Sequence, residues 1–304
     1  MNTPITGVVP PLVVPLKDGT LDLPSLERHI ERMLAAGIHG LFVNGSSGEV
    51  AFSGDERRDR VLEEALRIVD GRIPVLAGVI DTETERVLAH MRRAETLGAN
   101  VIVATAPFYA LQGETEVAEH FRILRQETSL PLFAYDIPVC VHWKLSNPLL
   151  LELGAEGVLQ GVKDSSGDDV AFRWLALANE KIGHPLSLLT GHEVVVDGAY
   201  MSGADGCVPG LGNVDPAAYV RQWNAYRAGD WATVRAEQDR LAELMRIVQV
   251  KGIQGFGAGA GAFKTALKAL GVFDSNEMPR PVKALAGENY AWVETVLREV
   301  GLDS

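Results

Sequence analysis

The chain has 304 residues, of which 47% are hydrophobic and 22% are charged, so it has enough apolar residues for a large core and lacks the composition of a disordered chain. Length alone permits two ordinary domains or one α/β barrel with an addition. The formal net charge of −12 and the pI of about 5.1 exclude a general electrostatic attraction to nucleic acid or to anionic membranes.

The sequence contains no recognisable targeting or membrane segment. Its first residues (1–19) are not basic, and their apolar run is too short for a signal peptide; no later stretch approaches the length that spans a bilayer. The two cysteines, Cys140 and Cys207, are far apart and form no CxxC motif, which argues against a disulfide framework or a cysteine-rich metal site. We therefore expect a cytoplasmic protein in which both cysteines are small packing residues.

Eight short apolar runs follow one another through the first 230 residues. The apolar residues in these runs are continuous rather than alternating in polarity, as expected of strands that are buried on both faces. The runs span 7–16, 40–45, 74–79, 100–106, 130–136, 157–163, 186–191 and 205–210.

Helical patterns lie between the first of these runs, over 23–37, 53–71, 82–98 and 114–129. The strand ends recur roughly every thirty residues, which is the period of one βα unit. The sequence therefore predicts an α/β protein whose residues 1–229 form a (β/α)8 TIM barrel. An open doubly wound sheet is disfavoured because no GxGxxG loop follows the first run. Residues 230–304 are predicted to form a C-terminal helical extension, with helices over 230–249, 262–272 and 288–301.

The reacting groups of such a barrel lie at the carboxyl ends of its strands. The second predicted strand ends in GSSGE (45–49), whose hydroxyls and backbone N–H groups suit a carboxylate, unless this is a simple Gly/Ser turn. The fourth strand is followed by Tyr109 and the fifth contains Tyr135. Each tyrosine is either catalytic or a packing residue with a hydrogen-bonded hydroxyl.

The sixth strand ends in GVKDSSG (161–167). A lysine that closes an apolar strand is expected to face the barrel mouth partly out of water, where desolvation disfavours the ammonium. The neutral amine that results is the form that attacks a ketone. The alternative is that Lys163 extends to the rim and pairs with Asp164.

The seventh strand ends in TGHE (190–193), where Gly191 would let a ligand approach the backbone. His192 and Glu193 would either bind substrate hydroxyls or cap the following helix. Neither HxH nor HExxH occurs, so no zinc site is expected, and no GxSxG nucleophile motif is present. The glycine-rich run 255–261 lacks GK[ST] and is expected to be a flexible lead into a helix rather than a phosphate loop.

Together these motifs resemble the dihydrodipicolinate synthase/N-acetylneuraminate lyase family of class I aldolases. The resemblance covers nearly the whole chain, including the helical extension. Each motif is short, but their order at successive barrel strands makes the set specific. The motifs are GSSGE (45–49), PFY (107–109), YDIP (135–138) and GVKDSSG (161–167).

The resemblance implies a mechanism without cofactor or metal. Lys163 would form a covalent imine with pyruvate or a related 2-oxo acid, and Tyr135 would act as general acid and base. Ser46 and Tyr109 would extend the proton relay. In relatives the second tyrosine can come from a neighbouring subunit, so the resemblance also implies a homotetramer built as a dimer of dimers.

Further contacts are implied for the substrate. Ser47 and the adjoining backbone N–H groups, including that of Gly48, would hold its carboxylate, and Gly191 and Val208 would line the site. Two positions depart from the lysine-biosynthetic members. Cys140 stands where those enzymes have an arginine that grips the carboxylate of the aldehyde, and a thiol cannot replace a bidentate guanidinium. Phe108 stands where they commonly have a tyrosine associated with lysine feedback.

The expected substrate is therefore a 2-oxo-3-deoxy sugar acid, cleaved reversibly to pyruvate and an aldehyde whose hydroxyls contact Ser165, His192 and Glu193. Three other functions stay open. One is 4-hydroxy-tetrahydrodipicolinate synthase, which condenses pyruvate with aspartate semialdehyde. The second is a dehydratase acting on the same imine. The third is a non-catalytic sugar-acid sensor, which would not need a nucleophilic lysine.

Overall fold

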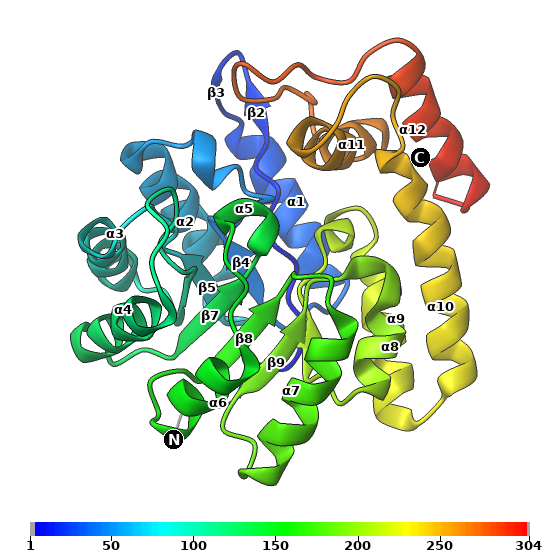
Figure 1. The fold of residues 1–304 in the computed structure, drawn as a ribbon. Coiled ribbons are helices and arrows are strands. Elements are labelled where there is room, and N and C mark those ends of the chain that lie inside the picture. The colour runs from blue at the N-terminus through cyan, green and yellow to red at the C-terminus, as the bar shows by residue number, and fades with distance from the viewer. Residues whose placement is uncertain (1–3, 303–304) are drawn as a thin grey trace.

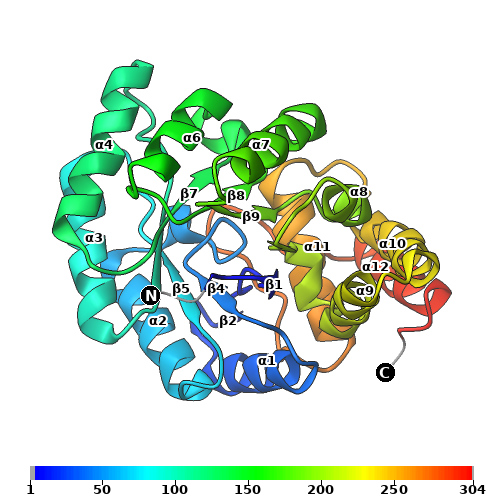
Figure 2. The same ribbon diagram turned by 90° about the horizontal axis from the view of Figure 1, so that it is seen from below.

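The computed structural model describes residues 4–302 as a parallel barrel ringed by helices, with a helical extension on one side (Figure 1, Figure 2). All eight predicted strands are confirmed, and each overlaps the run that predicted it. The barrel strands are β1 (Gly7–Val8), β4 (Leu41–Val43), β5 (Val75–Gly78), β6 (Val101–Ala104), β7 (Leu132–Asp136), β8 (Gly161–Asp164), β9 (Ser187–Thr190) and β10 (Gly206–Cys207).

Hydrogen bonds close the sheet into a barrel. The strands pair in parallel in the order β1-β10-β9-β8-β7-β6-β5-β4. The gap between β4 and the first strand segment is bridged by Phe42, whose N–H donates to the carbonyl of Pro10 at 3.0 Å and whose carbonyl accepts from the N–H of Leu12 at 2.8 Å. The predicted TIM barrel is thereby confirmed.

Helices surround the barrel, and side-chain caps explain where several of them begin. Asp22, Ser146 and Asp168 each accept a hydrogen bond from a backbone N–H three residues further on. The hairpin of β2 (Leu16–Lys17) and β3 (Thr20–Leu21) and the short α5 (Pro138–Val141) were not predicted. The other barrel helices are α1 (Leu23–Ala35), η1 (Val50–Phe52), α2 (Asp55–Val69), α3 (Thr84–Leu97), α4 (Glu114–Glu127), α6 (Asn147–Ala155), α7 (Asp169–Lys181), η2 (Glu193–Val195), α8 (Val196–Met201), η3 (Gly210–Asn213) and α9 (Pro216–Ala228).

The strands are buried on both faces, which explains why they are mostly apolar, with polar residues such as Lys163 and Thr190 at their carboxyl ends. Phe42, Phe133 and Leu189 belong to a cluster inside the barrel. The residues next to them, such as Leu41 and Leu132, belong to a larger cluster between the strands and the helices. Because side chains alternate along a strand, this arrangement fixes which residues of β7 and β8 face the interior.

The extension consists of α10 (Trp231–Leu244), η4 (Met245–Val248), α11 (Phe256–Ala269) and α12 (Glu288–Glu299). Figure 1 shows α10 running beside α8 and α9, and α11 lying at the end of the barrel near α5. Between residues 4 and 302 no helix combines the length and the hydropathy needed to cross a membrane.

The expectation of a flexible lead at 255–261 is wrong, because α11 begins at Phe256. Its small residues are buried against neighbouring segments. A Cβ atom added to Gly257 would lie 3.1 Å from Ile253 and 3.3 Å from Val282, so glycine permits a close approach there. Tertiary packing thus overrides the low helix propensity of this run.

Candidate active site

A cavity of about 360 Å³ opens at the carboxyl ends of the barrel strands. It brings together most of the site residues predicted from the sequence. Those that line it are Ser46, Ser47, Tyr135, Lys163, Ser165, Gly191, Glu193 and Val208.

Lys163 lies at the floor of this cavity. Only 5% of the residue is exposed, and its Nζ lies 3.9 Å from the ring centroid of Tyr135 and 4.8 Å from that of Phe42. Within residues 4–302 no carboxylate forms an ion pair with it, so the alternative that it reaches the rim and pairs with Asp164 is wrong. Asp164 instead accepts a hydrogen bond from the N–H of Ser166 at 2.8 Å. Among the described residues Lys163 is therefore a buried amine without a direct ion pair, and the one carboxylate that lines the same cavity, Glu193, is held by other donors.

The strand ladder sets the position of Tyr135 relative to Lys163. The two residues are direct partners in the parallel pairing of β7 with β8, so their side chains leave the sheet on the same face. The hydroxyl of Tyr135 lies 3.4 Å from that of Ser46. An amine, a phenol and a serine hydroxyl are thus in sequence, an arrangement suited to forming an imine and moving its protons.

The loop after β4 is a tight turn, and this limits which of its N–H groups can bind a carboxylate. The N–H of Gly48 donates to the carbonyl of Gly45, and that of Glu49 to the carbonyl of Ser46, both at 3.0 Å. The N–H of Gly48, which was expected to contact the substrate, is therefore already used by a hydrogen bond within the turn. In the described part of the chain, the N–H groups of Ser46 and Ser47 donate to no protein acceptor. They remain available to an anion.

A buried ion pair fixes the end of this turn. Glu49 is 1% exposed and has a left-handed φ of 61°, and its Oε1 lies 2.5 Å from Nζ of Lys264, which is fully buried on α11. The ammonium of Lys264 also donates to the carbonyl of Glu277 at 2.8 Å. Desolvation raises the pKa of Glu49, and the nearby ammonium opposes this shift. The extension thus holds the turn that carries both serines.

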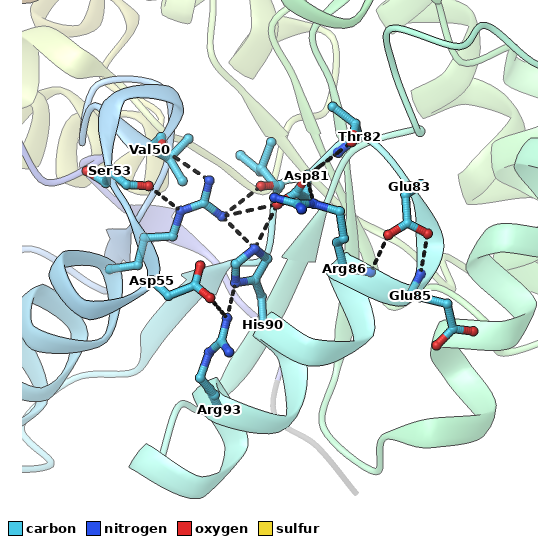
Figure 3. A network of polar contacts seen from close by, with 12 residues as sticks. Val50, Ser53, Asp55, Asp81, Thr82, Glu83, Glu85, Arg86, His90 and Arg93 are labelled. Carbon is cyan, nitrogen blue, oxygen red and sulfur yellow. Dashed lines mark hydrogen bonds and ion pairs between the residues drawn. The ribbon is translucent and has the colours of Figure 1, made fainter.

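A second network anchors the segment that follows the turn. The guanidinium of Arg58 donates to the carbonyls of Val50 and Ser53 and to Ile80 at the end of β5. Figure 3 shows the neighbouring carboxylate of Asp81, which binds Arg86 at 2.7 Å and His90 at 2.9 Å. Burial raises the pKa of Asp81, but these hydrogen bonds outweigh it and hold the pKa well below its usual range. Each of these groups has a protein partner, so the network positions the loop.

Ser165 and Gly191 depend on each other. A Cβ atom at position 191 would lie 2.1 Å from Oγ of Ser165, so glycine leaves room for this hydroxyl where it stands, and a larger residue would displace it. The backbone N–H groups of both residues are already hydrogen-bonded, to the carbonyls of Asp136 and Asp164. The hydroxyl of Ser165 is accordingly the part of this pair that faces the cavity.

Glu193 and His192 have other partners than the sequence suggested. Both carboxylate oxygens of Glu193 accept backbone N–H groups, from Gly210 at 2.8 Å and Leu211 at 2.9 Å, so it caps η3 rather than the helix that follows it. Burial raises the pKa of Glu193. His192 is not among the residues that line the cavity, and its Nδ1 lies 3.1 Å from Asp169.

Two further predicted residues lie outside the cavity lining. Tyr109 is 93% exposed and has a φ of +75°, a left-handed conformation that is uncommon for a tyrosine. It does not reach the site of its own chain. Cys140 is exposed on α5, and its thiol interacts with Ser46; partial burial raises the pKa of that thiol. Cys207, by contrast, is a fully buried packing residue.

The extension contributes to the cavity in a way that sequence reasoning missed. Its lining residues are Met245, Phe256, Gly259, Ala260 and Phe263, and the barrel adds Val139 on α5. No motif marks these residues, because their place depends on how α11 packs over the barrel end. No group of three or more His, Cys, Asp or Glu residues in the described ranges is arranged to hold a metal ion.

Comparisons with known proteins agree with this architecture. The model of the dihydrodipicolinate synthetase family matches residues 4–300. The 4-hydroxy-tetrahydrodipicolinate synthase of Phenylobacterium zucineum is 30% identical over 97% of both chains. An uncharacterized DapA-like lyase of Halobacterium salinarum is 33% identical over 97% of this chain and 94% of that relative.

Solved structures match over the same length. The dihydrodipicolinate synthase of Bacteroides thetaiotaomicron superposes with a TM-score of 0.92 at 30% identity, covering 98% of this chain and all of that one. YagE, a prophage protein of the dihydrodipicolinic acid synthase family from E. coli K12 solved in complex with pyruvate, gives a TM-score of 0.92 at 26% identity, covering 98% of this chain and 99% of that one. The chain therefore belongs to the dihydrodipicolinate synthetase family, whose members are class I, pyruvate-dependent lyases, and it is a carbon–carbon lyase.

Proposed function

We propose that this enzyme is an aldolase that reversibly cleaves a 4-hydroxy-2-oxo acid, deoxy at C3, into pyruvate and an aldehyde that carries no carboxylate at its far end. The observation that carries the proposal is the buried amine of Lys163, which has no counter-ion and lies against the ring of Tyr135. A structural lysine in such a place would be paired, because burying an isolated charge is costly.

The residues at the cavity floor provide a chemical group for imine formation and for the proton transfers of C3–C4 cleavage. The neutral amine of Lys163 attacks C2 of the 2-oxo acid, and the carbinolamine loses water to give a protonated imine. When the C3–C4 bond breaks, its electron pair moves into the imine as an enamine, and the C4 hydroxyl gives up its proton as the aldehyde forms. Tyr135 accepts that proton, with Ser46 at 3.4 Å as the next group of the relay. Protonation of C3 and hydrolysis release pyruvate and restore the amine.

The serine turn is proposed to bind the carboxylate of the 2-oxo acid. The hydroxyl of Ser47 and the N–H groups of Ser46 and Ser47 are the donors that the turn leaves available. Gly48 supports them indirectly, since a Cβ atom there would lie 3.1 Å from the carbonyl of Leu12. No cofactor or metal takes part in this scheme.

Cys140 supports an aldehyde without a distal carboxylate. Its thiol interacts with Ser46, and it has no positive charge with which to bind an anion. Aspartate semialdehyde is therefore the weaker candidate, although several relatives bear the name of the synthase that uses it. Product analysis separates the remaining alternatives. Free pyruvate indicates cleavage, an intact carbon chain indicates a dehydratase, and the absence of any adduct indicates a sensor.

Borohydride trapping tests the proposal. The protein is incubated with pyruvate and sodium borohydride, and the intact mass and the peptide map are then measured. We expect one reduced pyruvate adduct on Lys163 and none on the exposed lysines, because only Lys163 lies in the cavity beside Tyr135 and Ser46, which can move the protons of imine formation. An adduct spread over surface lysines, or no adduct, would reject the imine mechanism.

Tyr109 leads to a prediction about assembly. Because this exposed tyrosine lies outside its own cavity, we propose that it completes the relay of a neighbouring subunit in a dimer of dimers. Tyr109→Phe is then expected to lower kcat by about tenfold to a hundredfold, because one proton carrier is lost. Mixing Tyr109→Phe with the inactive Lys163→Ala chain should regenerate sites that have both residues. A lack of complementation in mixed oligomers would contradict the shared site.

A further inference from the structure

One wall of the cavity is apolar. Lys163, Tyr135 and Ser46 occupy the floor, and the serine turn occupies one side. The side chains that complete the cavity away from these groups are Val139, Met245, Phe256, Ala260 and Phe263. The part of a substrate that extends past C4 must pack against them.

Hydrogen-bonding groups for this part of the substrate are scarce. Each oxygen of Glu193 already accepts one backbone N–H group and keeps a single further lone pair, and the N–H groups of Gly191 and Val208 are bound to carbonyls. His192 lies outside the cavity lining. Of the three residues expected to bind sugar hydroxyls, only Ser165 presents a hydroxyl to the cavity. A polyhydroxylated chain would leave most of its hydroxyls desolvated without partners, and each such hydroxyl weakens binding on the order of tenfold.

The aromatic residues of this wall are held in place. Phe256 begins α11, and its ring lies 4.9 Å from that of Phe52 at an interplanar angle of 37°. Phe263 is buried about two turns further along, on the same face of this helix. Two positioned rings at one cavity provide the offset and edge-on contacts that another ring makes favourably.

We propose that the aldehyde partner has an apolar substituent, preferably an aryl group, rather than a hydroxylated or carboxylated chain. This inference rests on the proposed aldolase function and names the substrate class of the same site. The enamine of pyruvate on Lys163 adds through C3 to the aldehyde carbonyl carbon, and Tyr135 gives its proton to the carbonyl oxygen. Hydrolysis of the imine then releases a 4-aryl-4-hydroxy-2-oxo acid. No oxidant, reductant or further reactant is needed.

The size of the cavity agrees with such a product. About 360 Å³ holds a pyruvate unit and one six-membered ring, at the lower end of the volumes usual for small-molecule sites. The apolar wall does not support the sequence-based expectation of a sugar-derived aldehyde, because it offers few partners for hydroxyl groups. The reaction itself is the same in both cases, which makes a direct comparison possible.

The test compares several aldehydes as partners of pyruvate in the reaction of this enzyme. Addition of pyruvate to benzaldehyde, pentanal, D-glyceraldehyde and aspartate semialdehyde is followed by product mass and by kcat/KM. We expect benzaldehyde to exceed D-glyceraldehyde by about tenfold or more, which is the usual size of discrimination by an apolar site. Pyruvate trapping is measured on the same preparation.

The two aldehydes differ in intrinsic reactivity, and this difference cancels when the ratio of their kcat/KM values is compared between the wild type and variants of the wall. Phe256→Ser and Val139→Ser are expected to lower the benzaldehyde-to-glyceraldehyde ratio of kcat/KM about tenfold and severalfold, respectively. Val139 is 79% exposed, so its replacement does not endanger the fold. Val170→Ser on α7 is the matched control, since this valine is 69% exposed and does not line the cavity, and the ratio should not change.

The outcomes are distinguishable. A wild-type preference for benzaldehyde that falls in both wall variants supports the apolar class. If the pyruvate adduct forms on Lys163 but glyceraldehyde or aspartate semialdehyde is preferred, or the ratio does not respond to Phe256→Ser, the substrate class is overturned and the aldolase proposal stands. If no adduct forms, both proposals fail.

Discussion

The Lys163→Ala variant is expected to lose aldol turnover by a factor on the order of 10⁴ or more, because none of the other described lysines lines the cavity where the imine forms. It should nevertheless remain folded. Lys163 forms no ion pair among residues 4–302, and the buried carboxylate of Glu193, which feels its charge, keeps the N–H groups of Gly210 and Leu211 when the lysine is removed. The variant loses the packing contacts of the lysine methylenes, but it no longer has the free-energy cost of burying the amine, and the two effects offset each other.

Steady-state pyruvate release and thermal unfolding, measured on the same preparation, check this prediction. Lys181→Ala on the surface of α7 serves as the control and should match the wild type in both. Residual turnover within about a hundredfold of the wild type would mean that another nucleophile exists. A collapse of the melting temperature would show that Lys163 supports the fold.

Lys264→Met is expected to lose much of its stability, whereas Lys163→Ala is expected to lose turnover and stay folded. The carboxylate of Glu49, 1% exposed, would lose the ammonium that lies 2.5 Å away. Breaking one side of a buried ion pair typically costs about 3–5 kcal/mol, because the remaining charge is left uncompensated. Urea unfolding at pH 7 measures the difference, and the turn with Ser46 and Ser47 should lose order as well.

The pH dependence and a double variant identify the cause. Burial already raises the pKa of Glu49, and without Lys264 the folded state favours its protonated form still more. A carboxyl whose pKa is higher in the folded state loses stability as pH rises above the unfolded value of about 4.3, so Lys264→Met should become more stable as pH falls from 7 toward 5. Combining it with Glu49→Gln should recover part of the loss. A pH-independent deficit that the double variant does not reduce would assign the effect to packing alone.

The barrel was predictable because its signals are local. Strands buried on both faces require continuous apolar runs, and the residues that close them, such as Lys163, are set by position along the chain. The pairing of Tyr135 with Lys163 follows from strand order once the barrel is assumed. The site floor could therefore be assembled from one sequence.

The features of the site outside its floor depend on contacts between segments that are distant in the sequence. The place of Phe256 over the cavity requires α11 to cross the barrel end, and nothing near residue 256 encodes that crossing. The partners of Glu193 lie on η3, and the exposure of Tyr109 depends on a left-handed residue in a loop. Such features arise from packing that residue spacing does not report.

The division of the cavity between two parts of the chain has an evolutionary consequence. The groups proposed to activate pyruvate come from the repeating strands, whereas Met245, Phe256 and Phe263 come from the segment added after them. Mutations in that added segment can change which electrophile is admitted while the nucleophile is left intact. Exchange of residues 245–263 between paralogues is a direct way to diversify products without rebuilding the reaction centre.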